Sequence, residues 1–151
     1  MNEKLVYTVG HSNRTLGELV SLLKHYRIQV LVDVRRYPVS RRYPWFNREV
    51  LEERLPERGI EYIWLGDLLG GLGRDFREYM CSKEYRRGLG VLEEVASSRL
   101  TAFMCAERYW RRCHRRFIAE SLYRRGWRVV HIIDFDRVEV HVGLGEELSC
   151  W

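Results

Sequence analysis

Short apolar segments alternate with longer segments of helical periodicity, and this alternation restricts the fold more than any other feature of the sequence. Continuous apolar segments rich in β-branched and aromatic residues are typical of strands buried on both faces; they occupy 5–9, 30–34, 62–65, 100–105 and 129–133. The predicted helices, in which apolar residues recur at helical spacing, cover 15–26, 47–56, 76–80, 83–97 and 116–125. The pattern predicts a three-layer α/β fold, with a mainly parallel sheet of five or six strands and helices on both faces.

Residues at the ends of these segments support the predicted elements. Thr15 and Glu18 have the spacing of a capping box, which would start the first helix. Asn47 belongs to a residue type that caps helices, and it precedes the second helical segment. A further β-branched segment at 138–142 is expected to add a sixth strand at an edge of the sheet. Because the sequence has no repeat, low-complexity tract or linker, residues 1–151 are expected to form one domain.

The composition excludes several classes of protein. Hydrophobic residues make up 46% and charged residues 31% of the chain, as in a globular domain and unlike a disordered segment. No apolar run approaches the ~18 residues that a membrane-spanning helix needs. The first residues, MNEKLVYTVGHS, lack the basic start and long apolar stretch of a secretory signal. We therefore expect a cytoplasmic protein with no membrane association.

The charged residues are unusual in kind. There are 23 Arg against 3 Lys, 16 Glu against 5 Asp, and a single Gln. Abundant charge with few amides favours a thermophilic source, because ion-pair networks contribute more to stability at high temperature. A GC-rich genome would also enrich Arg. The source matters for the four cysteines, since intracellular proteins of hyperthermophiles can contain disulfides.

The net charge is positive. A formal charge of +5 and an isoelectric point near 9.2 permit an anionic partner, such as nucleic acid or a phosphate-bearing molecule. In segment 48–58, however, arginines alternate with glutamates, and ion pairs between residues i and i+4 on an exposed helix face account for them. The charge alone therefore does not identify a ligand.

Side chains that can do chemistry gather at the ends of the predicted strands. In a mainly parallel sheet, ligands bind beyond the carboxyl ends of the strands, where the strand order reverses. His11, Ser12 and Asn13 follow the first predicted strand, and Asp33 and Arg35 lie at the end of the second. Cys105 and Glu107 lie at the end of the fourth strand, and Cys113, His114 and Arg115 start the helix that comes after it. We expect all of them at this edge of the sheet, where one cleft is lined by His11, Ser12, Asp33, Arg35, Cys105, Glu107, His114 and Arg115.

The same segments resemble a known family. They are TVGHSN (8–13), LVDVRRYP (31–38), FN (46–47), FREYM (76–80), MCAE (104–107), CHRRFIAESL (113–122) and VVHI (129–132). Taken together, in this order and over nearly the whole chain, they are similar to domain-of-unknown-function family 488 (DUF488). The resemblance implies a small α/β domain but no reaction. Its characteristic polar residues correspond to His11, Ser12, Asp33, Arg35, Cys105, Glu107, Cys113, His114 and Arg115.

Three of these segments have two interpretations each. The turn at 10–13 either binds an anion through backbone N–H groups and the next helix N-terminus, or is an ordinary connection. It lacks the glycines of a Walker or Rossmann motif. Asp33 is either in a structural ion pair with a nearby arginine or a general base. The basic and aromatic segment 35–47 either contacts phosphates and stacks on bases, or covers the core.

Cys105 and Cys113 are harder to interpret. Their C-x7-C-H spacing matches none of the usual structural zinc patterns, so we expect no metal and no cofactor. A disulfide between them is an alternative. We favour an anion-binding corner in which Cys113 and His114 start a helix, where the thiol pKa falls. Cys105 is then a reactive thiol or a small packed residue. His131, inside a strand, is expected to be a core histidine, and no role is expected for His25, His141, Cys81 and Cys150.

Two hypotheses of function follow. In the first, the protein is an enzyme that acts on a phosphate-bearing substrate, a nucleotide or nucleic acid; the base is His11 or Asp33, and Glu107 or Cys105 is the acid or nucleophile. The residues expected to bind this substrate are Ser12, Asn13, Arg35, Cys113, His114 and Arg115. In the second, the chain is a non-catalytic nucleic-acid-binding module. The variety of titratable residues at the strand ends favours the enzyme, and segment 35–47 favours the module.

Overall fold

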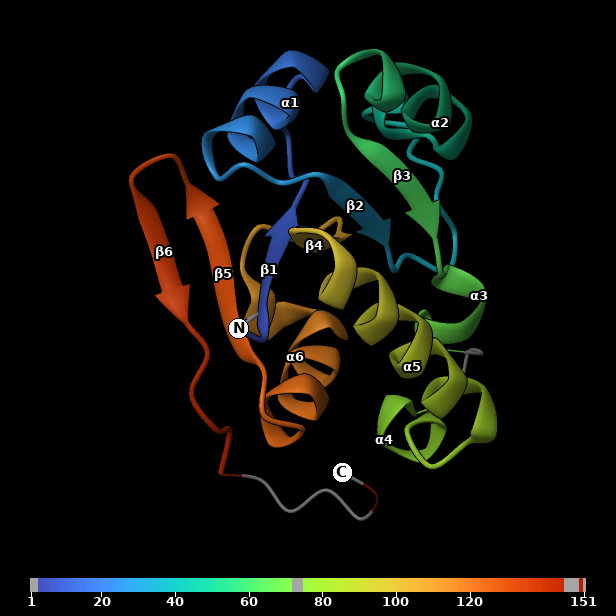
Figure 1. Cartoon of the computed structure of the whole chain (residues 1–151). Coiled ribbons are helices and arrows are strands. Elements are labelled where there is room, and N and C mark those ends of the chain that lie inside the picture. The colour runs from blue at the N-terminus through green and yellow to red at the C-terminus, as the bar shows by residue number, and fades with distance from the viewer. Residues whose placement is uncertain (1–2, 72–74, 146–149, 151) are drawn as a thin grey trace.

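Six strands form the central sheet of the protein (Figure 1). A computed structural model describes residues 3–71, 75–145 and 150. The strands are β1 (Leu5–Gly10), β2 (Val30–Asp33), β3 (Glu61–Trp64), β4 (Thr101–Cys105), β5 (Arg128–Asp134) and β6 (Arg137–Val140). They lie in the order β3-β2-β4-β1-β5-β6, and all neighbours are parallel except β5 and β6, which pair antiparallel. The prediction of a mainly parallel sheet with a sixth strand at an edge is confirmed.

Helices cover both faces of this sheet, as predicted (Figure 1). They are α1 (Leu16–His25), η1 (Pro44–Phe46), α2 (Arg48–Glu57), α3 (Gly66–Leu69), α4 (Phe76–Tyr79), α5 (Lys83–Ser98), η2 (Trp110–Arg112) and α6 (Arg115–Arg124). Two separate buried clusters result, because successive strand residues point to opposite faces. Leu31 packs with the leucines of α1 and α2, whereas Val30 and Val32 pack with α5 and α6.

The helix that follows the central strand β4 lies on the other face of the sheet from the helices that follow its neighbours, β1 and β2. The chain passes from β1 into α1 and from β2 into α2, which lie on one face. After β4 it passes into α6 on the opposite face. Such a reversal opens a crevice beyond the carboxyl ends of the strands. The topology therefore places the residues that follow β1, β2 and β4 around one hollow.

Helices α1 and α2 both begin where their predicted capping residues indicate, but only α1 is capped by the predicted hydrogen bonds. Thr15 Oγ1 accepts from the Glu18 backbone N–H at 3.1 Å, and Glu18 Oε1 accepts from the Thr15 N–H at 2.8 Å, which completes the capping box. Asn47 precedes α2 but does not cap it with its side chain. Asn47 Oδ1 accepts instead from the Ser40 N–H at 2.6 Å, and so holds the loop before α2 in place.

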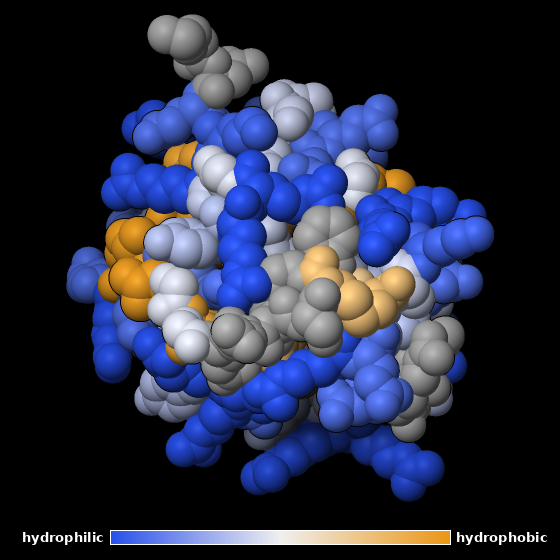
Figure 2. Space-filling model, turned by 90° about the horizontal axis from the view of Figure 1, so that it is seen from below, coloured by the Kyte–Doolittle hydropathy of each residue, from blue (hydrophilic) through white to orange (hydrophobic). Residues whose placement is uncertain are grey.

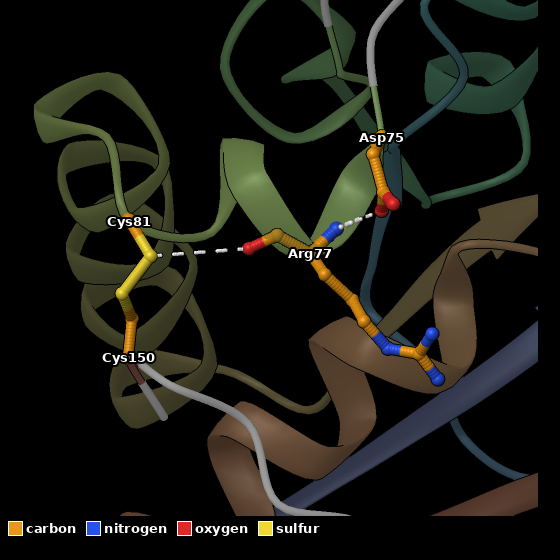
Figure 3. Close-up of a disulfide and its surroundings, with 4 residues drawn as sticks. All are labelled: Asp75, Arg77, Cys81 and Cys150. Carbon is orange, nitrogen blue, oxygen red and sulfur yellow. Dashed lines mark hydrogen bonds between the residues drawn. A yellow bond between two sulfur atoms is a disulfide. The ribbon is translucent and has the colours of Figure 1, made fainter.

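A disulfide joins Cys81, just after α4, to Cys150 near the C-terminus (Figure 3). The two Cα atoms are 5.3 Å apart, and the residues are separated by 69 positions. Asp75 caps the short helix α4 next to the bridge, accepting from the Arg77 N–H at 2.9 Å. The expectation that Cys81 and Cys150 have no role was wrong, because spacing alone does not reveal which distant cysteines meet.

We expect replacement of Cys81 or Cys150 with Ser to lower the free energy of unfolding by about 2–4 kcal/mol, because the bridge restricts the unfolded chain. Urea denaturation of the unreduced proteins measures this loss. Each single variant should lose as much as the double variant, since either substitution removes the same cross-link. An unchanged denaturation midpoint, or four titratable thiols in the unreduced protein, would contradict the prediction.

The exposed surfaces of the helices carry the charge that the sequence predicts. Arg48 and Glu52 form an exposed i,i+4 ion pair at 2.6 Å on α2, and Arg54 pairs with Glu57 at 3.7 Å. On the face shown in Figure 2, hydrophilic side chains cover most of the surface, and apolar side chains form small separate groups. Within the described ranges, no helix has both the length and the apolar character needed to cross a membrane.

Candidate functional site

A cavity of about 1070 Å³ lies beyond the carboxyl ends of β1, β2 and β4. Eight of the ten residues expected at the site line it: His11, Ser12, Asn13, Arg35, Cys105, Glu107, Cys113 and His114. Asp33 and Arg115 do not line it, because both side chains are fully buried beneath its wall. The structure therefore brings together side chains as distant in the sequence as His11 and His114.

Close contact between the ends of β1 and β4 builds the floor of the cavity. The His11 N–H donates to the Cys105 carbonyl at 3.0 Å, and the Ser12 N–H donates to the Ala106 carbonyl at 2.9 Å. A Cβ atom at Gly10 would lie 1.7 Å from the Glu107 carbonyl oxygen, so only glycine fits there. Ser12 has a φ of 52°, a left-handed conformation that costs a residue other than glycine energy. This turn directs His11 toward β2.

The surroundings of His11 determine which of its ring nitrogens carries the proton. Its Nδ1 lies 2.9 Å from the Ser12 carbonyl oxygen, which can only accept, so Nδ1 is the protonated nitrogen. The unprotonated Nε2 faces Arg35 Nη1 at 3.3 Å. Burial lowers the pKa of His11 to about 4, and the charge of Arg35 acts in the same direction. His11 is therefore a neutral imidazole with a lone pair on Nε2.

Arg35 is held by an ion pair beneath the cavity. Arg35 Nε and Nη2 donate to the two carboxylate oxygens of Asp33 at 2.9 and 2.7 Å, and Nη2 also donates to the Phe46 carbonyl at 2.7 Å. The Tyr62 hydroxyl donates to Asp33 at 2.5 Å, and burial together with the Asp33 charge raises the pKa of Tyr62. Of the two interpretations of Asp33, the structure has the ion pair. Asp33 positions Arg35, and through it His11.

Cys105 and Cys113 meet at the wall of the cavity, with their sulfur atoms 2.8 Å apart. Cys113 immediately precedes the N-cap residue of α6, so the prediction that it starts a helix close to Cys105 is confirmed. A hydrogen bond from the Cys105 thiol and the charge of Arg115 lower the pKa of Cys113 to about 7. The same hydrogen bond, with burial, raises the pKa of Cys105. Of the two sulfurs, Cys113 is therefore the one that loses its proton more readily, and Cys105 is the one that keeps it.

Arg115 lies under this pair, with no exposed surface. Its Nη2 donates to the carbonyls of Glu107 and Arg108 at 3.0 and 3.1 Å. Its Nε and Nη1 have no hydrogen-bond partner among the described residues. The expectation that Arg115 holds a substrate directly does not fit this burial. Its charge acts on the cysteines, since it lowers the pKa of Cys113.

Both interpretations of the basic and aromatic segment 35–47 hold, each for a different part of the segment. Its later part covers the core: Phe46 is fully buried against His11, and Trp45 Nε1 donates to the Arg14 carbonyl at 2.9 Å. Its earlier part lines the cavity, where Tyr37 is 75% exposed. Arg36, Tyr37 and Tyr43 of this segment line the cavity, and lining residues that sequence reasoning missed include Phe76, Arg108, Tyr109 and Arg112. Most lie within a few positions of a predicted residue, and this nearness is the signal that would have found them.

Two buried histidines form a hydrogen-bonded chain that runs from β1 to α6. The Thr8 hydroxyl and His131 Nδ1 are 2.6 Å apart, His131 Nε2 and His141 Nδ1 are 2.9 Å apart, and His141 Nε2 lies 2.9 Å from Glu120. The His131 ring stacks on Trp110 at 4.0 Å. Burial lowers the pKa of His131 to about 2. His131 is a hydrogen-bonded core histidine, as predicted, and His141 is its partner.

His114 completes the cavity wall, and its Nε2–H donates to the Val34 carbonyl at 2.9 Å. Burial lowers the pKa of His114 as well. Within the described part of the chain, no three His, Cys, Asp or Glu side chains are grouped so that they could hold a metal ion.

No curated protein and no solved structure matches the chain significantly. A family model matches residues 15–122, a range that contains every site residue described above from Asp33 to Arg115, although the 11–13 turn lies just before it. Since the match covers more than two thirds of the sequence, the chain belongs to the family named Domain of unknown function DUF488.

Proposed function

We propose that the cavity binds an anionic, phosphate-bearing compound, a nucleotide or nucleic acid, and that the protein is an enzyme acting on it. The observation that carries the proposal is the charge of the cavity wall. Four arginines line it, whereas Glu107 is the one carboxylate among the described lining residues. Arginine guanidinium groups are well matched to phosphate oxygens. The Arg112 side chain is exposed and has no hydrogen-bond or ion-pair partner among the residues that the structure describes, and Arg36 and Arg108 line the same cavity.

His11 is the base in this proposal. It is neutral, its tautomer is determined by Ser12, and its Nε2 accepts only a long contact of 3.3 Å from Arg35, with which a substrate can compete. The arginine charges that help lower the pKa of His11 would be offset by a bound phosphate. Binding of the anion therefore raises the pKa of His11 toward the range in which a general base works best. Glu107, exposed at the rim, is the candidate acid.

The other predicted residues have supporting roles in this proposal. Ser12 and Asn13 lie on the turn that ends at the cavity, and His114 also lines it. Arg35 faces both His11 and the cavity, so it orients the base and adds positive charge. The buried Asp33 and Arg115 act through Arg35 and Cys113, and do not contact the substrate. The proposal assigns a substrate class and an acid–base role but no bond.

The first test is binding of inorganic phosphate, a mononucleotide and a random single-stranded oligonucleotide to the reduced protein, measured calorimetrically over a range of salt concentrations. We expect Arg112→Gln to weaken phosphate-bearing ligands about tenfold, a loss of ~1.4 kcal/mol for one exposed charge-assisted contact. The matched control is Arg58→Gln. Arg58 is exposed at the end of α2 and lies close to the start of β3, so it is near the amino ends of the strands, whereas the cavity lies at their carboxyl ends. Absence of binding by all three ligands at low salt would contradict the proposal.

A nucleic-acid-binding module remains the second candidate, because exposed aromatic rings flank the arginines of the cavity. Tyr37 is 75% exposed and Tyr109 is 45% exposed, so both rings are available for stacking on bases. Affinity that grows with oligonucleotide length and falls steeply with salt would favour the module. Conversion of a bound phosphate compound, followed by phosphorus NMR and lost in His11→Gln, would favour the enzyme.

A further inference from the structure

The two cysteines outside the disulfide form a pair of their own. Cys105 and Cys113 are free, and their sulfur atoms are 2.8 Å apart, so a disulfide of about 2.05 Å requires only a small movement. Both side chains line the cavity, and small molecules that enter it can reach them. The acid–base chemistry proposed above uses neither sulfur as its base or its acid. The pair therefore needs a separate explanation.

The burial of Arg115 indicates that one member of the pair is an anion. A fully buried guanidinium with two unfilled donor atoms, Nε and Nη1, is costly unless a negative charge lies nearby. No ion pair between Arg115 and a carboxylate is found among the described residues. A thiolate at Cys113 supplies the missing negative charge, since the charge of Arg115 acts on this sulfur. The N-terminus of α6, which begins at Arg115, adds a favourable dipole.

Burial distinguishes the roles of the two sulfurs. Cys113 is partly exposed in the cavity wall, whereas Cys105 is 2% exposed. An oxidant in the cavity therefore meets Cys113 first. Cys105 retains its proton and lies at contact distance behind Cys113, which suits it to react second.

We propose that the Cys113–Cys105 pair reduces hydroperoxides. The Cys113 thiolate attacks the terminal peroxide oxygen and the O–O bond breaks, which gives a sulfenic acid on Cys113 and an alkoxide or hydroxide that takes a proton from water. The Cys105 sulfur then attacks the Cys113 sulfur, the S–O bond breaks, and the Cys105 proton leaves with the hydroxyl group as water. An external dithiol restores both thiols by thiol–disulfide exchange and is itself oxidised.

This activity does not depend on the proposed phosphate-bearing substrate, so either proposal can fail alone. The first measurement is titration of free thiols in the unreduced protein before and after one equivalent of hydrogen peroxide. We expect two thiols to fall to none, with mass spectrometry showing a Cys105–Cys113 disulfide. At pH 6 the reaction should be at least about fivefold faster than in the same chain unfolded in denaturant, because more of Cys113 is thiolate. With dithiothreitol, each chain should consume many equivalents of peroxide.

Substitutions separate the two roles. Cys105→Ser should stop the reaction at a sulfenic acid on Cys113, trapped by dimedone at one equivalent per chain. Cys113→Ser should abolish the fast reaction and leave Cys105 reduced. The matched control is the double variant Cys81→Ser/Cys150→Ser, whose substitutions lie outside the cavity and should leave the peroxide reaction unchanged.

Wild-type protein provides a test that does not require a variant to fold. Alkylation as a function of pH should modify Cys113 with a midpoint near pH 7 and leave Cys105 protected. Two outcomes would overturn the proposal. One is that both thiols survive stoichiometric peroxide; the other is that both are oxidised at the rate of the unfolded chain without forming a disulfide.

Discussion

Replacement of Asp33 by Asn is expected to lower the free energy of unfolding by about 3–5 kcal/mol, because it leaves the buried Arg35 guanidinium without a counter-charge. Asn retains one acceptor oxygen, but its amide group donates and would face the donors of Arg35. A loss of this size is a large fraction of the 5–15 kcal/mol by which domains are typically stable. Urea denaturation at pH 7 measures it.

The matched control for this substitution is Glu52→Gln. The Arg48–Glu52 pair is as short as the Asp33–Arg35 pair, but Glu52 is 48% exposed and the Asp33 side chain 0% exposed. Exposed pairs contribute about 0–1 kcal/mol, so Glu52→Gln should change stability little. The double variant Asp33→Asn/Arg35→Met should lose less than Asp33→Asn alone, because it removes the uncompensated charge. Equal effects of Asp33→Asn and Glu52→Gln would refute the interpretation.

Acid is expected to destabilise the protein well above the range in which carboxylates titrate. Histidines have a pKa near 6.5 in unfolded chains, whereas burial lowers the pKa of His11 to about 4 and of His131 to about 2. The unfolded chain therefore binds more protons than the folded protein below pH 6.5. Stability is fully present above pH 6.5 and falls as the pH decreases. These two histidines together should cost on the order of 5 kcal/mol between pH 7 and pH 4.

The measurement is the free energy of unfolding at pH 7, 6, 5 and 4. Near pH 5 the slope should be about 2.5 kcal/mol per pH unit, which corresponds to nearly two protons taken up on unfolding. The lowered pKa values of His114 and His141 act in the same direction. A flat profile between pH 6.5 and 5 would contradict the burial of neutral histidines.

The sequence was sufficient to predict the fold because periodicity reports burial directly. The segment around Leu31 is apolar at every position, which is what a strand with helices on both faces requires. Parallel strands place their carboxyl ends at one edge, so His11 and Cys105 could be placed together without knowing the strand order. The resemblance to DUF488 pointed to the same residues, and the family match supports it.

What the sequence could not show depends on contacts between distant residues. Asp33 and Arg115 are charged residues near a site, and only the structure reveals that neither side chain reaches the cavity. Asn47 has the composition and position of a helix cap, but a loop N–H competes for its oxygen. The partnership of Cys81 with Cys150 spans 69 positions and leaves no local pattern. In each case the outcome depends on which of several possible partners a side chain contacts, and the residue type alone does not determine that partner.

The position of β4 between β1 and β2 also has a consequence for how the protein folds. β1 is made first, but its neighbour β4 begins at Thr101, so their pairing must close a loop of more than ninety residues. Pairings between such distant segments are slow, because chain entropy is lost before the contacts form. Until β1 and β4 pair, nothing holds the residues after β1 next to the residues after β4. We therefore expect the complete cavity to appear only in the late step in which β1 pairs with β4, and chains in which this pairing has not formed to lack the side of the cavity that carries His11.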